Sequence, residues 1–106
     1  MSNLMEAAVL HAPGDLRIDR VPVPTELGPE DALVKVIAAG ICGSDIGRVM
    51  TTGTYKFPTI PGHEFAGVIV DLGSSVKTSK IGDRVAVAPL MPCFSCDSCA
   101  RGHYSL

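Results

Sequence analysis

Closely spaced glycines and prolines limit this chain to short secondary-structure elements. Eleven glycines and eight prolines are spread over 106 residues, and both residue types interrupt long helices and central strands. Between these breaks lie short apolar runs rich in Val and Ile, which favour strands. Because the runs recur at a spacing of roughly 8–12 residues, the sequence predicts an all-β barrel or sandwich. A chain of this length has room for one small core.

The positions of these breaks locate the expected strands. They are predicted at residues 6–11, 16–21, 32–39, 64–72 and 84–88. The first two flank turn residues and are expected to pair as a hairpin. The third carries a single charge and is expected to be largely buried. A short helix is predicted to follow a cap at Ser44 or Asp45. No G-x-G-x-x-G motif occurs, so the sequence contains no dinucleotide-binding fingerprint.

The charge balance argues against a nucleic-acid or anionic-membrane partner. Nine Lys and Arg residues stand against eleven Asp and Glu residues, which gives a net charge of -2. Aromatic residues make up 5% of the chain and Trp is absent, so base-stacking platforms are not expected. We recognise no signal peptide and no apolar run long enough to span a bilayer. A cytoplasmic location is therefore expected, where neighbouring thiols are more often metal ligands than disulfides.

Three cysteines near the C-terminus form the most specific motif of the chain. Cys93, Cys96 and Cys99 are separated by two residues each, a spacing that lets backbone N–H groups point at thiolate sulfurs. Zinc prefers four ligands in a tetrahedron, and three thiols supply most of such a set. An iron–sulfur cluster uses a similar run, but continues to a fourth cysteine followed by proline. Here that position is His103, so zinc is favoured over iron, and inert thiols are the remaining alternative.

The fourth ligand of this cysteine lobe (residues 90–106) is left open by the sequence. His103 would complete a Cys3His site. Otherwise the ligand lies beyond Leu106, and we expect the chain to be cut within the lobe. So short a segment has few large apolar residues and is expected to need a bound metal to become ordered.

A second group of potential ligands occurs earlier in the chain. Cys42 follows the end of one predicted strand, and His63 and Glu64 lie at the start of another. A Cys–His pair can be a thiol nucleophile with its base, or two ligands of a catalytic zinc that keeps one position open. Asp45 or Glu64 would then hold the second nitrogen of the imidazole. Spacing alone does not choose between these interpretations.

Four sequence blocks together carry a resemblance to a known family. They are Gly40-Ile41-Cys42-Gly43-Ser44-Asp45, Pro61-Gly62-His63-Glu64-Phe65-Ala66-Gly67, Gly82-Asp83-Arg84-Val85 and the three spaced cysteines. In order and spacing they resemble the zinc-dependent medium-chain alcohol and polyol dehydrogenases. The chain looks like the N-terminal GroES-like catalytic domain of that family over residues 1–106, without the Rossmann domain. The run at residues 89–94 is most similar to the sugar-alcohol branch, the galactitol-1-phosphate and sorbitol dehydrogenases.

The resemblance implies roles for individual residues. Cys42 and His63 would be ligands of a catalytic zinc, and Glu64 a ligand in some states and a nearby carboxylate in others. Asp45 would orient His63, and Ser44 would begin the proton relay from the bound alcohol. The ligands implied for a separate structural zinc are Cys93, Cys96 and Cys99. A fourth cysteine of that set, and one further catalytic ligand, would lie outside this sequence.

The function implied is oxidation of a secondary alcohol of a polyol or sugar alcohol to a ketone. Zinc would polarise the alcohol oxygen, and hydride would pass to NAD or NADP held by the absent domain. The fragment alone is expected to be inactive, and the full-length enzyme to be a homo-oligomer with a small-molecule substrate. The alternatives are a stand-alone zinc-binding structural or assembly module and an iron–sulfur electron carrier.

The loop between the two ligand motifs carries Arg48, Tyr55 and Lys56. In an enzyme acting on polyol phosphates, its cations would meet the substrate phosphate and Tyr55 would line the pocket. A solvated loop is the simpler interpretation, because most surface Lys and Arg side chains are only hydrated.

Overall fold

A two-residue turn folds the first part of the chain into a hairpin. In this computed structural model, which describes residues 3–105, β1 (Leu4–Ala12) pairs antiparallel with β2 (Asp15–Pro22). Pro13 presets the turn geometry, and Gly14 takes a positive φ of 80°, which only glycine adopts easily. The expected hairpin is confirmed, with each strand slightly longer than predicted.

The second sheet contains three antiparallel strands in the order β3-β4-β5. They are β3 (Ala32–Ala39), β4 (Phe65–Leu72) and β5 (Arg84–Val87), close to the predicted ranges. Gly67 in β4 lies so near β3 that a Cβ there would be 2.1 Å from the carbonyl oxygen of Lys35. Glycine is therefore required at this position of the paired strands β3 and β4.

The helical segments are short and follow the break after β3. Helix α1 (Gly43–Gly47) is capped by Cys42, two or three residues earlier than the predicted cap, and continues into the π-helix η1 (Arg48–Thr52). Gly53, with φ 73°, ends this segment. The one-turn helix α2 (Asp97–Ala100) lies in the cysteine lobe and was not predicted.

Hydrogen bonds connect the hairpin to the loop that precedes β4. The backbone N–H of Leu10 donates to the carbonyl of Thr59 at 2.8 Å, and the reciprocal bond is 3.1 Å long. Leu10 is fully buried, and Val9 and Ile69 are nearly so. The small core thus lies around the C-terminal half of β1 and the middle of β4.

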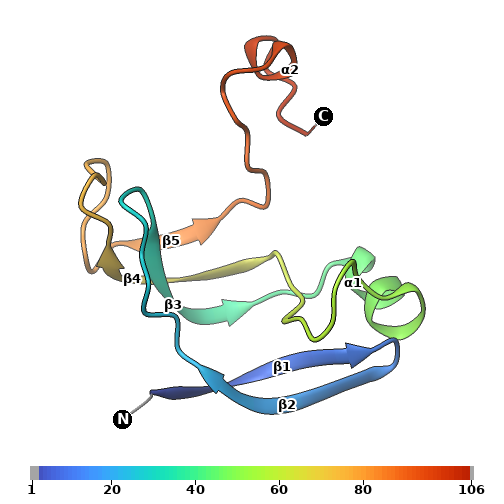
Figure 1. The fold of residues 1–106 in the computed structure, drawn as a ribbon. Coiled ribbons are helices and arrows are strands. Elements are labelled where there is room, and N and C mark those ends of the chain that lie inside the picture. The colour runs from blue at the N-terminus through green and yellow to red at the C-terminus, as the bar shows by residue number, and fades with distance from the viewer. Residues whose placement is uncertain (1–2, 106) are drawn as a thin grey trace.

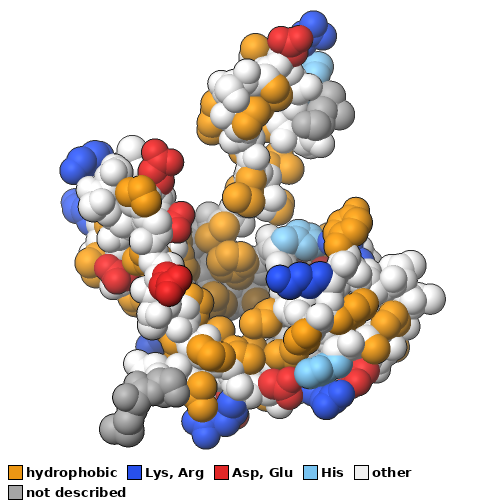
Figure 2. Space-filling model, viewed as in Figure 1, with side chains coloured by type: hydrophobic (Ala, Val, Ile, Leu, Met, Phe, Trp, Pro, Cys, Tyr) orange, Lys and Arg blue, Asp and Glu red, His pale blue; other side chains and the backbone are white. Residues whose placement is uncertain are grey.

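The expectation that the third strand is largely buried is wrong. In β3 only Leu33 and Val34 are half-buried, and Val36 is 52% exposed. The physical reason is that the hairpin and the three-stranded sheet enclose an apolar hollow of about 690 Å³ instead of packing face to face. Figure 2 shows hydrophobic side chains lining the space between the two sheets.

The predicted all-β architecture is confirmed as a set of open sheets. Figure 1 shows the hairpin below the three-stranded sheet, with α1 at one side. The chain after β5 extends away from both sheets and ends in the lobe that contains α2 (Figure 1). Within residues 3–105, no helix is long and apolar enough to cross a membrane.

Candidate functional site

Pairing of β3 with β4 brings the two ligand motifs together. Ala39 at the end of β3 is opposite Phe65 at the start of β4. One residue further, the backbone N–H of Gly40 donates to the carbonyl of Glu64 at 2.7 Å. The segments that leave β3 and enter β4 are therefore neighbours, although more than twenty residues separate them in the sequence.

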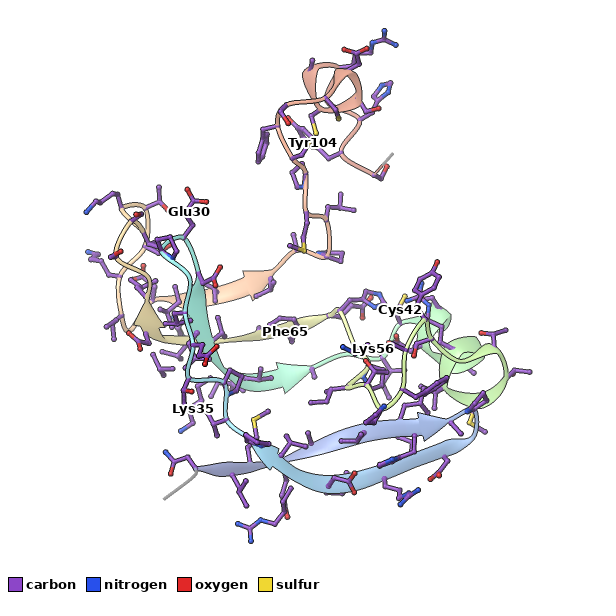
Figure 3. All side chains as sticks on the ribbon, viewed as in Figure 1. Glu30, Lys35, Cys42, Lys56, Phe65 and Tyr104 are labelled. Atoms are coloured by element: carbon purple, nitrogen blue, oxygen red, sulfur yellow. The ribbon has the colours of Figure 1, made fainter. Side chains whose placement is uncertain are left out.

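The side chains of Cys42, His63 and Glu64 converge at this point. One thiol sulfur, one imidazole nitrogen and one carboxylate oxygen all lie within 4.8 Å of one another. Figure 3 shows Cys42 where the chain turns from β3 into α1. Thiolate, imidazole and carboxylate are the three ligand types that zinc takes in proteins, and a three-ligand set leaves a position open for substrate. The residues present thus fit a zinc ion.

Gly40 leaves the space that the Glu64 carboxylate occupies. A Cβ at this position would lie 2.8 Å from Glu64 Oε2 and 3.4 Å from its Cβ. The φ of Gly40 is not in the left-handed region, so steric room and not backbone freedom explains the glycine.

Asp45 connects two of the converging residues. It is 9% exposed. Its Oδ2 accepts a hydrogen bond of 3.0 Å from the backbone N–H of Cys42, and its Oδ1 lies 3.5 Å from Nδ1 of His63. A carboxylate facing one nitrogen of a histidine leaves the other nitrogen available for a metal. In the structure, Asp45 thus lies on the Nδ1 side of the His63 ring.

Two hollows meet at His63. A polar pocket of about 460 Å³ has Ser44, Asp45 and His63 in its wall, and the apolar hollow between the sheets reaches His63 and Glu64. Ser44 is exposed, and its hydroxyl can both donate and accept a hydrogen bond. The ligand group thus has one polar and one apolar approach.

The cysteine lobe holds the second ligand group. The sulfurs of Cys93, Cys96 and Cys99 lie within 4.8 Å of one another, with 3.8 Å between those of Cys93 and Cys99. The backbone N–H of Ser95 approaches the Cys93 sulfur at 3.5 Å, and that of Cys99 approaches the Cys96 sulfur at 3.4 Å. These N–H groups stabilise thiolates, the form that binds a metal.

Hydrogen bonding changes the acidity of one thiol in the lobe. Ser95, through its side chain and then its backbone, lowers the pKa of Cys93 to about 6, with smaller contributions from Cys96 and Cys99. His103 does not belong to the group of three cysteines, and its backbone N–H donates to the carbonyl of Ser98. Within residues 3–105 the lobe therefore presents three ligands, all sulfur.

A family comparison agrees with this geometry. The alcohol dehydrogenase GroES-like domain matches residues 28–106. The chain belongs to this family. Sorbitol dehydrogenase of Bombyx mori is 45% identical over 94% of the chain, which spans 30% of that relative. Galactitol 1-phosphate 5-dehydrogenase of Escherichia coli is 38% identical over 95% of the chain and 29% of the relative.

Solved structures of the alcohol dehydrogenase GroES-like family share the fold. The crystal structure of galactitol-1-phosphate dehydrogenase from Escherichia coli superposes with a TM-score of 0.90 at 38% identity. The match covers 95% of this chain and 29% of the galactitol-1-phosphate dehydrogenase chain. The cobalt- and zinc-bound alcohol dehydrogenase from Pyrobaculum aerophilum superposes with a TM-score of 0.89 at 32% identity. That match covers 98% of this chain and 32% of the Pyrobaculum chain. The chain therefore spans about 30% of the relatives it matches.

The structure separates the three loop residues that the sequence grouped together. Arg48 lines the polar pocket with Thr54, whereas Tyr55 and Lys56 do not. Tyr55 is fully exposed. The sequence signal that could have placed Arg48 on the pocket wall was its position four residues after Ser44, because residues four apart share one helix face.

Proposed function

We propose that the full-length protein containing this chain is a zinc-dependent oxidoreductase. It would oxidise a secondary alcohol of a polyol or sugar alcohol to a ketone with NAD or NADP. The chain contributes the GroES-like catalytic domain over residues 1–106. The observation that carries the proposal is the convergence of Cys42, His63 and Glu64 beside a polar pocket. The named activities of its relatives on sorbitol and galactitol 1-phosphate support the substrate class.

Oxidation of an alcohol removes a proton from oxygen and a hydride from carbon. Cys42, His63 and Glu64 would hold a zinc ion, whose positive charge would make the hydroxyl acidic enough at neutral pH. Ser44, on the pocket wall, accepts the hydroxyl proton and passes it outward, because its own hydroxyl both accepts and donates. The hydride acceptor would be the nicotinamide ring of NAD or NADP, which a part of the protein outside this chain would hold.

Asp45 supports this chemistry without touching the substrate. Its buried carboxylate fixes the ring of His63 and the backbone at Cys42 at the same time. Two ligands from different segments are thereby held in one geometry, which a metal site needs. Asp45 is therefore a positioning residue.

We assign a structural role to the cysteine lobe. Its sulfurs are three soft ligands with N–H groups directed at two of them. The lobe extends away from the sheets and none of its described residues is buried, so a bound zinc would supply most of its order (Figure 1).

The test is alcohol oxidation by the full-length protein. A panel of polyols and sugar-alcohol phosphates is assayed with NAD and with NADP, following the reduced nicotinamide by absorbance. Removing the metal with a chelator should abolish turnover, and added zinc should restore it. The Cys42→Ala variant should fold, as judged by circular dichroism, and lack activity. Turnover retained by this variant would overturn the assignment.

A further inference from the structure

The polar pocket beside the candidate zinc ligands contains a single arginine. Its wall includes Ser44, Asp45, Arg48, Thr54 and His63, and among residues 3–105 no other Lys or Arg lines it. Its volume of about 460 Å³ lies within the range of small-molecule binding sites. Arg48 is therefore the one permanent positive charge that a ligand entering this pocket would meet.

The helical segment explains why this arginine faces the pocket. Helix α1 continues directly into η1, so Ser44 and Arg48 are about one helical turn apart on one face. Ser44 is nearer Cys42, at the end where the reacting hydroxyl would sit. The guanidinium lies one turn further, roughly 6 Å along the helix. The two side chains thus suit opposite ends of one extended substrate.

No other group neutralises Arg48 in the part of the chain that the structure describes. The ion pairs found among residues 3–105 involve His11, Arg17 and His63, not Arg48. Asp45, the one carboxylate that the described residues contribute to the pocket wall, accepts the N–H of Cys42 and faces His63.

The other polar side chain on the wall has a structural role. The Thr54 hydroxyl donates to the carbonyl of Lys56 at 2.9 Å, which fixes the loop. Thr54 therefore has no proton left to donate to an anion. Among the described side chains of the pocket wall, Arg48 is the one that carries a permanent positive charge.

We infer that Arg48 is the anion-binding residue of the substrate pocket. The substrate would be an alcohol bearing a phosphate monoester or a carboxylate several carbons from the hydroxyl that is oxidised. A guanidinium matches both groups, because its planar donors form two parallel hydrogen bonds with a pair of oxygens. This inference rests on the proposed function and narrows its substrate class.

Steady-state kinetics of the full-length protein provide the test. Three substrates with the same carbon chain are compared: the neutral polyol, its terminal phosphate and the corresponding sugar acid. The wild-type protein should have a higher kcat/KM for one of the two anionic substrates, which identifies the anion. In Arg48→Met, the ratio of kcat/KM for that substrate to the neutral polyol should fall roughly ten- to hundred-fold. Arg48→Lys should give an intermediate ratio.

The control is Arg20→Met, which removes an exposed arginine from β2, far from the pocket lining. Its substrate ratio should equal that of the wild type. An unchanged ratio in Arg48→Met, or equal loss of activity on all three substrates, would overturn the inference while leaving the proposed function intact. If no alcohol is oxidised with either nicotinamide, the proposed function is wrong and this inference falls with it.

Discussion

Asp45 performs two tasks that substitutions can separate. One oxygen caps the backbone N–H of Cys42 at 3.0 Å, and the other lies 3.5 Å from His63 Nδ1. Asp45→Ala removes both of these contacts, so we expect a loss of about 1–2 kcal/mol in the free energy of unfolding. Asp45→Asn keeps a capping oxygen, and its stability should stay within about 0.5 kcal/mol of the wild type. Both variants lose the negative charge that faces the imidazole.

Zinc affinity should respond differently from stability. Loss of a carboxylate behind a metal-binding histidine typically weakens metal binding about 10- to 100-fold, so both variants should show this decrease. Stability is measured by urea titration of the chelator-treated full-length protein, and affinity by competition with a chromophoric chelator. The matched control is Asp19→Asn, which alters the carboxylate 2.6 Å from His11 on the hairpin and should leave zinc affinity unchanged. Wild-type zinc affinity in Asp45→Asn would refute the reasoning.

Further variants test close contacts and the cysteine lobe. Gly67→Ala should destabilise the protein by about 2–3 kcal/mol in urea titration, because its Cβ would overlap a backbone carbonyl of β3. Gly47→Ala, in open space on α1, should instead be neutral or stabilising by up to about 1 kcal/mol. An equal loss of stability in Gly67→Ala and Gly47→Ala would disprove the steric cause. Gly40→Ala should displace the Glu64 carboxylate and lower zinc affinity; unaltered affinity would count against this contact. Cys96→Ser should accelerate proteolysis within the lobe only, and unchanged protease resistance there would contradict its structural role.

Local sequence chemistry predicted the strands well. Gly and Pro residues mark the ends of the hairpin strands and of β3 and β4, so the predicted ranges lie close to those in the structure. Burial could not be predicted in the same way. The apolar composition of β3 indicates a buried strand, but burial depends on what covers a face, and Ile37 remains exposed.

Candidate residues for the site could be named from the sequence, but their geometry could not. Cys42 and His63 were identified from their motifs, but only the pairing of β3 with β4 shows that they meet. Asp45 was expected to orient His63, whereas its second bond to the Cys42 backbone depends on the local turn. The pocket position of Arg48 follows from the helix that links it to Ser44, which the two nearby glycines made difficult to predict.

The most direct test is the zinc content of the purified full-length protein, measured by elemental analysis per chain. Two independent ligand groups predict two zinc ions in the wild type and one in each of Cys42→Ala and Cys96→Ser. Only the Cys42 variant should lose alcohol oxidation outright. A metal-free wild-type protein that oxidises alcohols at full rate would contradict the account.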